Sequence, residues 1–261
     1  MTRLLSGLVL IAVSIGGIWF APLWGMVVLV EIVLVGAAIE YAVLAEKSGV
    51  PVPRVVTIAA AGVVCAAVAF QRVPTDLILI AVLLAGGVTV LASYQPSGHV
   101  PATAAAAFFP VLYLGVPLGA IVALRESYGR EVLLIAVAIV IVSDTAQFYT
   151  GTLLGKRRLA PTISPKKSVE GAIGGFVAGI ALTMVLGRLW LPHLDLLTLA
   201  ALGAIVVALG ITGDLFESLL KRSANVKDSS GLIPGHGGVL DRIDALLFAV
   251  PGFYLFLRLL A

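Results

Sequence analysis

The residues whose types could do chemistry are concentrated in one stretch, residues 218–244. This stretch carries four cations (Lys221, Arg222, Lys227 and Arg242) and three carboxylates (Asp228, Asp241 and Asp244). Carboxylates bind Mg²⁺ together with phosphate oxygens, and lysine and arginine neutralise phosphate groups. Because most of the remaining chain is apolar and charge is costly near a bilayer, this stretch predicts chemistry on a phosphorylated substrate.

A predicted helical face leads into this stretch. Asp214, Glu217, Ser218 and Lys221 are spaced i, i+3, i+4 and i+7, so a helix presents them on one side. The preceding residues VVALGIT are apolar, which places Asp214 at the inner end of a membrane span and makes it a functional candidate. A surface carboxylate paired with Lys221 is an alternative for Glu217, but Asp214 lies one turn deeper.

Glycine marks the loop that follows, residues 227–238. Its four glycines give a backbone that can approach a phosphate closely, and His236 lies among them. Beyond the loop, Asp241 and Asp244 are three residues apart and could face one metal site. Each residue alone also has an ordinary explanation, as a turn glycine, a cytoplasmic cation or a capping aspartate.

A second charged region covers residues 143–175. Asp144 lies near the inner end of one predicted span, as Asp214 does in another. The loop after Asp144 supplies five cations: Lys156, Arg157, Arg158, Lys166 and Lys167. Ser168 followed by Glu170 is typical of a helix start, and helix N-termini bind phosphate. These cations could instead anchor anionic lipid headgroups, an alternative that is weaker for the two lysines beside the helix start.

The elements that must position these residues are membrane spans. The chain of 261 residues is 60% hydrophobic and only 12% charged, far from a soluble domain at about 25% charged. We predict an all-α, polytopic integral membrane protein. Runs of about 20 apolar residues give nine spans: Leu4–Pro22, Trp24–Ala45, Val55–Phe70, Leu77–Ser93, Ala102–Leu124, Val132–Thr150, Val169–Leu191, Leu196–Leu220 and Ala245–Leu260.

Lysine and arginine predict the orientation. Nine spans place most of them, including both charged loops, on the side of the N-terminus, which is therefore cytoplasmic. This explains the basic composition without a nucleic-acid partner. We expect an N-terminal bundle over residues 1–130 and a catalytic bundle over residues 131–261, with cytosolic loops 151–168 and 221–244.

Some features stay ambiguous at this point. Gly171, Gly175 and Gly179 recur every four residues, which permits close helix packing inside the monomer or in a homodimer. Glu31 and Glu40 lie in one span, where they could form a proton path or be satisfied by hydrogen bonds between helices. The sequence contains no Cys/His cluster for zinc and no P-loop motif.

The charged stretch resembles a known signature. Its residues are Ser218-x-x-Lys221-Arg222-x4-Lys227-Asp228 and Pro234-x-His236-Gly237-Gly238-x-x-Asp241-Arg242-x-Asp244. This pattern is similar to that of the phosphatidate cytidylyltransferases (CDP-diacylglycerol synthases). Residues Ser143-Asp144-Thr145, Gly155-Lys156 and Ile163-Ser164-Pro165-Lys166-Lys167-Ser168-x-Glu170-Gly171 also resemble that family. One departure is Ala146-Gln147, where the family pattern has Gly-Ala.

The resemblance implies the reaction of CTP with phosphatidate, giving CDP-diacylglycerol and pyrophosphate, at a cytosolic active site of the inner (plasma) membrane. It also implies Mg²⁺ held by Asp214 and Asp241, with Asp144 and Asp244 as further candidates, and it leaves open a second, monovalent or divalent cation. The expected phosphate-screening residues are Lys166, Lys167, Lys221, Arg222, Lys227 and Arg242. Expected nucleotide contacts are Ser164, Ser218, His236, Gly237 and Gly238.

Two other functions compete with this one. A CTP-using kinase of an isoprenoid alcohol would share the nucleotide and the membrane setting. A transporter would use Glu31, Glu40, Asp144 and Asp214 as an ion path, with its acids near the middle of the bilayer. Asp144 and Asp214 are instead expected at the cytosolic ends of their spans beside cationic loops, which favours an enzyme.

Overall fold

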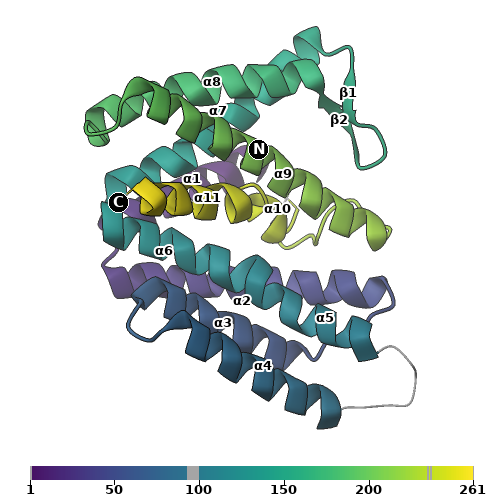
Figure 1. Ribbon diagram of the computed structural model, residues 1–261. Helices are drawn as coiled ribbons and strands as arrows, with labels where there is room; N and C mark the ends of the chain where they lie inside the picture. The colour runs from purple at the N-terminus through teal and green to yellow at the C-terminus, as the bar shows by residue number, and fades with distance from the viewer. Residues whose placement is uncertain (1, 93–99, 234, 236, 261) are drawn as a thin grey trace. The chain divides into compact units, whose positions relative to one another are not determined.

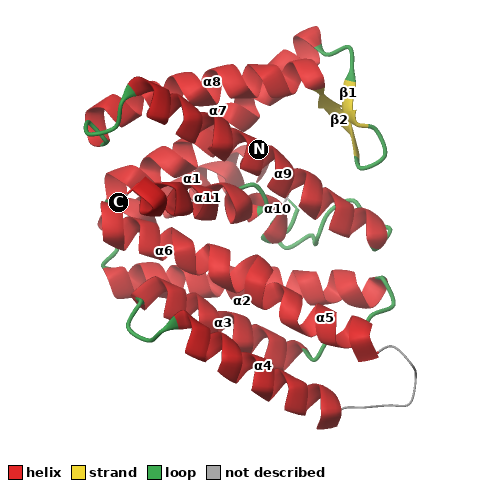
Figure 2. Ribbon diagram, viewed as in Figure 1, coloured by secondary structure: helices red, strands yellow, loops and turns green. Residues whose placement is uncertain are grey.

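The protein is built almost entirely from helices, as the computed structural model shows for residues 2–92, 100–233, 235 and 237–260 (Figures 1 and 2). The helices are α1 Thr2–Phe20, α2 Leu23–Lys47, α3 Arg54–Phe70, α4 Thr75–Ala92, α5 Val100–Pro110, the π-helical turn η1 Val111–Gly115, α6 Val116–Tyr128, α7 Arg130–Leu154, α8 Val169–Trp190, α9 Leu196–Ser223, α10 Leu240–Ile243 and α11 Leu246–Leu260. Two short strands, β1 Arg158–Ala160 and β2 Ser164–Ser168, lie between α7 and α8.

The helices are long and apolar enough for a multi-pass membrane protein. Within the described residues, seven helical segments meet the length and composition needed to cross a membrane, and α3, with 17 residues, is a shorter apolar helix. One of the seven is the continuous run Val100–Tyr128, in which a π-helical turn follows Pro110. The predicted all-helical, polytopic fold is confirmed, but the predicted number of nine spans is not.

The chain divides into two compact units. Unit 1 comprises residues 1–123 and 220–242, and unit 2 comprises residues 124–219 and 243–261. The residues of α9 are thus shared, with its last turn assigned to unit 1. The division predicted from the sequence, at residue 130, separates a scaffold from a catalytic bundle by expected role. That division stays a prediction.

Small residues allow the helices of unit 1 to pack closely. In this unit α3 contacts α2, α4, α5 and η1, and Figure 1 shows α2, α3 and α4 side by side. A Cβ atom on Gly115 would lie 2.6 Å from the Ala61 carbonyl oxygen, and one on Gly119 would lie 2.6 Å from that of Cys65. Cys65 itself is a buried free cysteine whose side chain hydrogen-bonds to Glu31.

In unit 2, the glycine face of α8 is used inside the monomer. A Cβ atom on Gly175 would lie 2.5 Å from Cγ of Gln147 on α7, and one on Gly179 would lie 2.3 Å from a methyl group of Val207 on α9. Gly171 likewise packs against the Gln147 carbonyl oxygen. The three glycines therefore let α8 lie against α7 and α9, as small residues do in membrane helix packing.

The start of α9 is fixed by a side-chain cap. Asp195 accepts hydrogen bonds from the backbone N–H of Thr198 at 2.8 Å and from its hydroxyl at 3.1 Å. Because these bonds, led by the backbone one, favour the charged carboxylate, they lower the pKa of Asp195. This cap anchors the N-terminal end of the helix that carries Asp214.

The hairpin β1–β2 was not predicted from the sequence. Its strands are antiparallel, with Arg158 opposite Ser168 and Ala160 opposite Ser164. Ser168 also caps α8, because its hydroxyl oxygen accepts the Gly171 N–H at 3.1 Å. The predicted helix start at Ser168 is confirmed, and loss of such a cap costs about 0.5–2 kcal/mol.

Candidate functional site

Unit 2 contains a cavity of about 600 Å³ lined by two carboxylates and three cations. The carboxylates are Asp144 of α7 and Asp214 of α9, and the cations are Arg158, Lys166 and Lys167 of the hairpin. We call it the α7–α9 cavity. Its wall combines cation-binding oxygens with phosphate-binding side chains, which is the combination predicted for a polyphosphate substrate with a divalent metal.

Lys167 is the central cation of this cavity. Its ammonium lies 2.6 Å from Oδ2 of Asp214, and the two side chains are 18% and 27% exposed. Asp144 is close enough for its charge to interact with both Lys167 and Asp214. A positive charge thus already lies beside two carboxylates that would otherwise repel each other.

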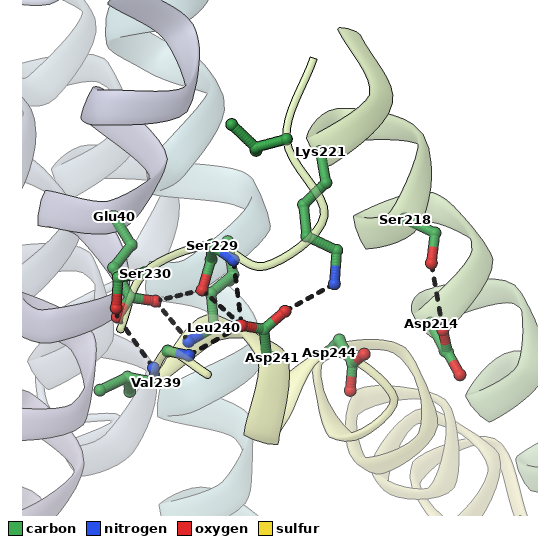
Figure 3. Close-up of polar contacts among 12 residues, drawn as sticks. Glu40, Asp214, Ser218, Lys221, Ser229, Ser230, Val239, Leu240, Asp241 and Asp244 are labelled. Carbon is green, nitrogen blue, oxygen red and sulfur yellow. Dashed lines mark hydrogen bonds and ion pairs between the residues drawn. The ribbon is translucent and has the colours of Figure 1, made fainter. Parts of the chain in front are cut away.

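Hydrogen bonds orient the two carboxylates. Gln147, one turn along α7, donates its amide N–H to Oδ1 of Asp144 at 3.0 Å. Ser218, one turn along α9, has its hydroxyl oxygen 3.4 Å from Oδ1 of Asp214 (Figure 3). Both partners follow from helical spacing, because residues three or four apart share a face.

Close backbone packing brings the hairpin to the cavity. Ser168 and Gly171 lie against Gly151 near the end of α7, where a Cβ atom would be 3.0 Å from the Ser168 hydroxyl. Glu170 then accepts the backbone N–H groups of Lys156 and Arg157 at 3.0 and 3.2 Å. These contacts tie both ends of the hairpin to the α7–α8 pair and so place Lys166 and Lys167 at the cavity wall.

The donor set suits Mg²⁺. Magnesium is commonly held by one or two carboxylates together with water and substrate phosphates, rather than by a complete protein cage. Asp144 and Asp214 supply two such carboxylates, and Lys167 shows that a cation is stable beside them. Among the residues that the structure describes, no group of three or more histidine, cysteine or acidic side chains forms a closed metal site.

A second polar group, which we call the Asp241 cluster, lies in unit 1 (Figure 3). Oδ1 of Asp241 is 2.5 Å from the Lys221 ammonium. Oδ2 accepts the backbone N–H groups of Ser229 at 3.0 Å and Gly238 at 2.7 Å, and the Ser229 hydroxyl lies 2.9 Å away. The Asp241 side chain is only 5% exposed, so its charge is compensated almost wholly by protein groups.

The paired glycines of the loop are required by these contacts. Gly237 has φ +78°, and a Cβ atom there would lie 2.6 Å from Oδ2 of Asp241. A Cβ atom on Gly238 would lie 2.0 Å from the Ser229 hydroxyl oxygen. The close approach that the sequence indicated is therefore made toward carboxylates of the protein itself, and contact with a phosphate stays a prediction.

The other predicted site residues are placed as follows. Arg222 donates to the Val226 carbonyl oxygen at 3.0 Å, and Lys227, Asp228 and Arg242 are exposed. Glu217 is fully buried.

The remaining predicted residues lie in other segments. Ser164 begins β2, and Oδ1 of Asp244 accepts the Ala245 N–H at 2.7 Å. His236 lies outside the described residues. Asp214 and Asp241 belong to different units, and their sharing of a metal stays a prediction.

Sequence reasoning left three contributors unassigned. Arg158 lines the cavity, although the sequence left it between catalysis and lipid anchoring. Gln147 supports Asp144, and its position at i+3 on a helix was the available signal. Glu40 contacts the loop that precedes Asp241. In the sequence it was only a carboxylate inside an apolar span, which is equally compatible with a proton path.

Comparison with known proteins gives one family over nearly the whole chain. The sequence model of the cytidylyltransferase family matches residues 1–260. Phosphatidate cytidylyltransferase of Haemophilus influenzae is 42% identical over 133 residues, which cover 49% of this chain and 46% of that protein. The Bacillus subtilis enzyme of the same name is 37% identical over 153 residues, covering 57% of this chain and 56% of the enzyme.

A longer match is found in Helicobacter pylori. Its phosphatidate cytidylyltransferase is 34% identical over 191 residues, which cover 73% of this chain and 68% of that protein. For the first two relatives the match spans about half of their length.

Proposed function

This chain belongs to the cytidylyltransferase family, and from that premise we propose that it transfers the cytidylyl group of CTP to phosphatidate, giving CDP-diacylglycerol and pyrophosphate. A phosphate oxygen of phosphatidate attacks the α-phosphorus of CTP and forms a new P–O bond. The bond from the α-phosphorus to the oxygen that bridges to the β-phosphate breaks, and pyrophosphate leaves with that oxygen. The nucleophile is already an anion, so the reaction needs charge screening and orientation more than a strong base.

The observation that carries this proposal is the α7–α9 cavity. Arg158, Lys166 and Lys167 give it the positive charge to bind a triphosphate, and its acids face the same space. Lys167 keeps its ion pair with Asp214 in the free protein and exchanges that partner for phosphate oxygens when CTP binds. Ser168 and the start of α8 form the adjoining wall.

We propose Asp144 and Asp214 as the residues that hold Mg²⁺. When bound, the metal neutralises phosphate charge and stabilises the leaving pyrophosphate. Gln147 and Ser218 keep the two carboxylates oriented, and Lys167 balances their charge before substrate arrives. A second, monovalent or divalent cation belongs to the same proposal.

The Asp241 cluster is proposed to serve the same reaction. Lys221 is held in place by Asp241 and supplies a fixed positive charge, while Arg222, Lys227 and Arg242 add exposed positive charges for the two anionic substrates. Support comes from the ion pair between Lys221 and Asp241, because a short, largely buried, charge-assisted contact holds a side chain in place.

The setting of the reaction follows from the helices. Phosphatidate would reach the protein from the bilayer and CTP from the cytosol, which requires both charged loops on the cytosolic side of the inner membrane. No nucleic-acid partner is proposed. Because the glycine face of α8 packs inside unit 2, a homodimer would need another surface.

The test uses purified protein in detergent with CTP labelled at the α-phosphate, Mg²⁺ and phosphatidate. We expect label in the organic phase that requires phosphatidate, disappears with a chelator and is lost in Asp214→Asn. Label from the γ-phosphate of CTP appearing on an isoprenoid alcohol would move the chain to the kinase function. Absence of both products from folded protein would overturn the proposal and favour transport.

A further inference from the structure

Glu40 is a carboxylate inside α2 that has four hydrogen-bonding neighbours in a segment near the other end of the chain. Oε1 accepts from the Ser230 hydroxyl at 2.6 Å and the Val239 N–H at 2.9 Å. Oε2 accepts from the Leu240 N–H at 2.8 Å, and the Ser229 hydroxyl lies 2.8 Å from it (Figure 3). All of these residues belong to unit 1.

The burial of Glu40 makes these bonds necessary. The residue is only 4% exposed, and a carboxylate inside a membrane span is costly unless its lone pairs are used. An ionised carboxylate offers about four acceptor positions. Ser230 and the backbone N–H groups of Val239 and Leu240 use three of them, and the Ser229 hydroxyl is close enough to use the fourth.

The loop is shaped to fit around Glu40. A Cβ atom on Gly238 would lie 2.4 Å from Oε2 of Glu40, so only glycine permits this approach. One turn earlier on α2, a Cβ atom on Gly36 would lie 3.2 Å from a methyl group of Val239. One face of α2 therefore provides both space and hydrogen-bond acceptors for the loop.

Ser229 joins Glu40 to Asp241. Its hydroxyl oxygen is 2.8 Å from Oε2 of Glu40 and 2.9 Å from Oδ2 of Asp241, and its single hydrogen can serve one carboxylate at a time. The backbone gives a second connection, because Gly238 donates to Asp241 while the next two residues donate to Glu40. A shift of Glu40 would therefore move the groups that hold Asp241.

We propose that Glu40 is a positioning residue, which fixes residues 229–230 and 238–240 and thereby orients Asp241 and Lys221 for cytidylyl transfer. This inference rests on the proposed function of the chain. Glu40 touches no substrate in this scheme and moves no proton; it acts only through the loop.

The test is Glu40→Gln in the full chain, measured by hydrogen exchange and by turnover. The amide keeps the shape of the side chain but has one acceptor oxygen, and it turns an N–H₂ group toward a backbone N–H. We expect exchange in peptides covering residues 229–243 to become about tenfold faster. We expect kcat to fall about 10–100-fold, with the KM for CTP nearly unchanged, because misplacement by about 1 Å is enough for such a loss.

Glu31→Gln is the matched control. Glu31 is a second carboxylate within the apolar part of α2 and lies beside Gly62 of α3, so its substitution should leave loop exchange and kcat near the wild-type values. Glu40→Asp keeps both oxygens on a shorter side chain and should recover part of the lost kcat. If Glu40→Gln does not fold, Glu40→Asp and Ser230→Ala carry the same measurements.

Three outcomes would overturn the inference: unchanged exchange in Glu40→Gln, faster exchange with normal turnover, or equal effects of Glu31→Gln. Wild-type protein and Asp241→Asn are assayed beside the variants. A wild-type chain that labels no lipid defeats the proposed function, whereas an active wild type with an unaffected Glu40→Gln variant defeats the inference alone.

Discussion

The carboxylates of Asp241 and Asp214 differ in how many of their hydrogen-bond acceptor positions are used by protein groups. Asp241 is 5% exposed and contacts an ammonium, two backbone N–H groups and a hydroxyl. Asp214 is 27% exposed, forms an ion pair with Lys167 and faces a cavity of about 600 Å³. A carboxylate whose oxygens are mostly engaged by protein groups is less accessible to a ligand than one that faces a cavity.

This difference separates two residues for which the sequence predicts the same role. Asp214 and Asp241 were both predicted as metal ligands. Asp214 has accessible oxygens beside a second carboxylate, whereas Asp241 must release a protein partner before it can bind anything else. We therefore propose the α7–α9 cavity as the first place to look for ligand binding, and the Asp241 cluster as a support for the loop.

The largest expected effects come from Asp214→Asn and Asp241→Asn. Both should nearly abolish turnover, but only Asp241→Asn should lower the free energy of unfolding strongly, because it leaves the Lys221 ammonium without its ion partner. Breaking a buried ion pair costs about 3–5 kcal/mol. Thermal unfolding in detergent, read beside the lipid-labelling assay, measures both. Equal losses of stability in the two variants would contradict a structural role that belongs to Asp241 and not to Asp214.

The next largest effect is expected for Lys167→Ala. Removing the central cation of the cavity should raise the KM for CTP by about 10–100-fold, as expected when a charged contact to phosphate is lost. Lys47→Ala changes an exposed lysine at the end of α2 and serves as the control. If Lys167→Ala alters membrane retention but not the KM, the cation is a lipid anchor.

Gly238→Ala tests the packing of the loop. The new methyl group would lie 2.0 Å from the Ser229 hydroxyl oxygen and 2.4 Å from Glu40, so the loop must move. We expect a loss of about 1–3 kcal/mol in stability together with reduced kcat. Gly231→Ala, where nothing lies within 4 Å of the added atom, should be neutral in the same denaturation and turnover assays.

The smallest effect is expected for Gln147→Ala. It removes the 3.0 Å hydrogen bond to Asp144. A hydrogen bond to a charged group in a protein interior contributes about 1.5–3 kcal/mol. The contribution is smaller here because the cavity is open to water. We expect a severalfold fall in kcat/KM measured across Mg²⁺ concentrations. Thr212→Ala, which removes only a hydroxyl bonded to its own helix, should not change it.

The sequence predicted the architecture well where the signal was hydropathy. The apolar runs predicted the multi-pass helical fold, the start of α8 followed from Ser168, and the family resemblance is confirmed by the match over residues 1–260. The span count was less secure because segments such as α3 are close to the minimum length. The hairpin was missed because its strands have only three and five residues and carry charge instead of alternating apolar side chains.

Contacts between distant residues were the part that sequence could not supply. The pairing of Lys167 with Asp214 joins residues from the hairpin and α9, and no local pattern connects them. Likewise, the sequence could place Glu40 inside a span but could not show that its partners come from a loop near the other end of the chain. Helical spacing identified residues that share one face of a helix. It does not predict which other helix or loop packs against that face.

The long separation between Glu40 and its partners has a consequence for biogenesis. The Leu240 amide is synthesised 200 residues after Glu40, which at about 5–20 residues per second is a delay of roughly 10–40 s. During that interval α2 enters the membrane with a carboxylate whose final hydrogen-bond donors do not yet exist. Until the C-terminal donors arrive, this side chain needs another way to avoid a bare charge in hydrocarbon, such as contact with water or uptake of a proton.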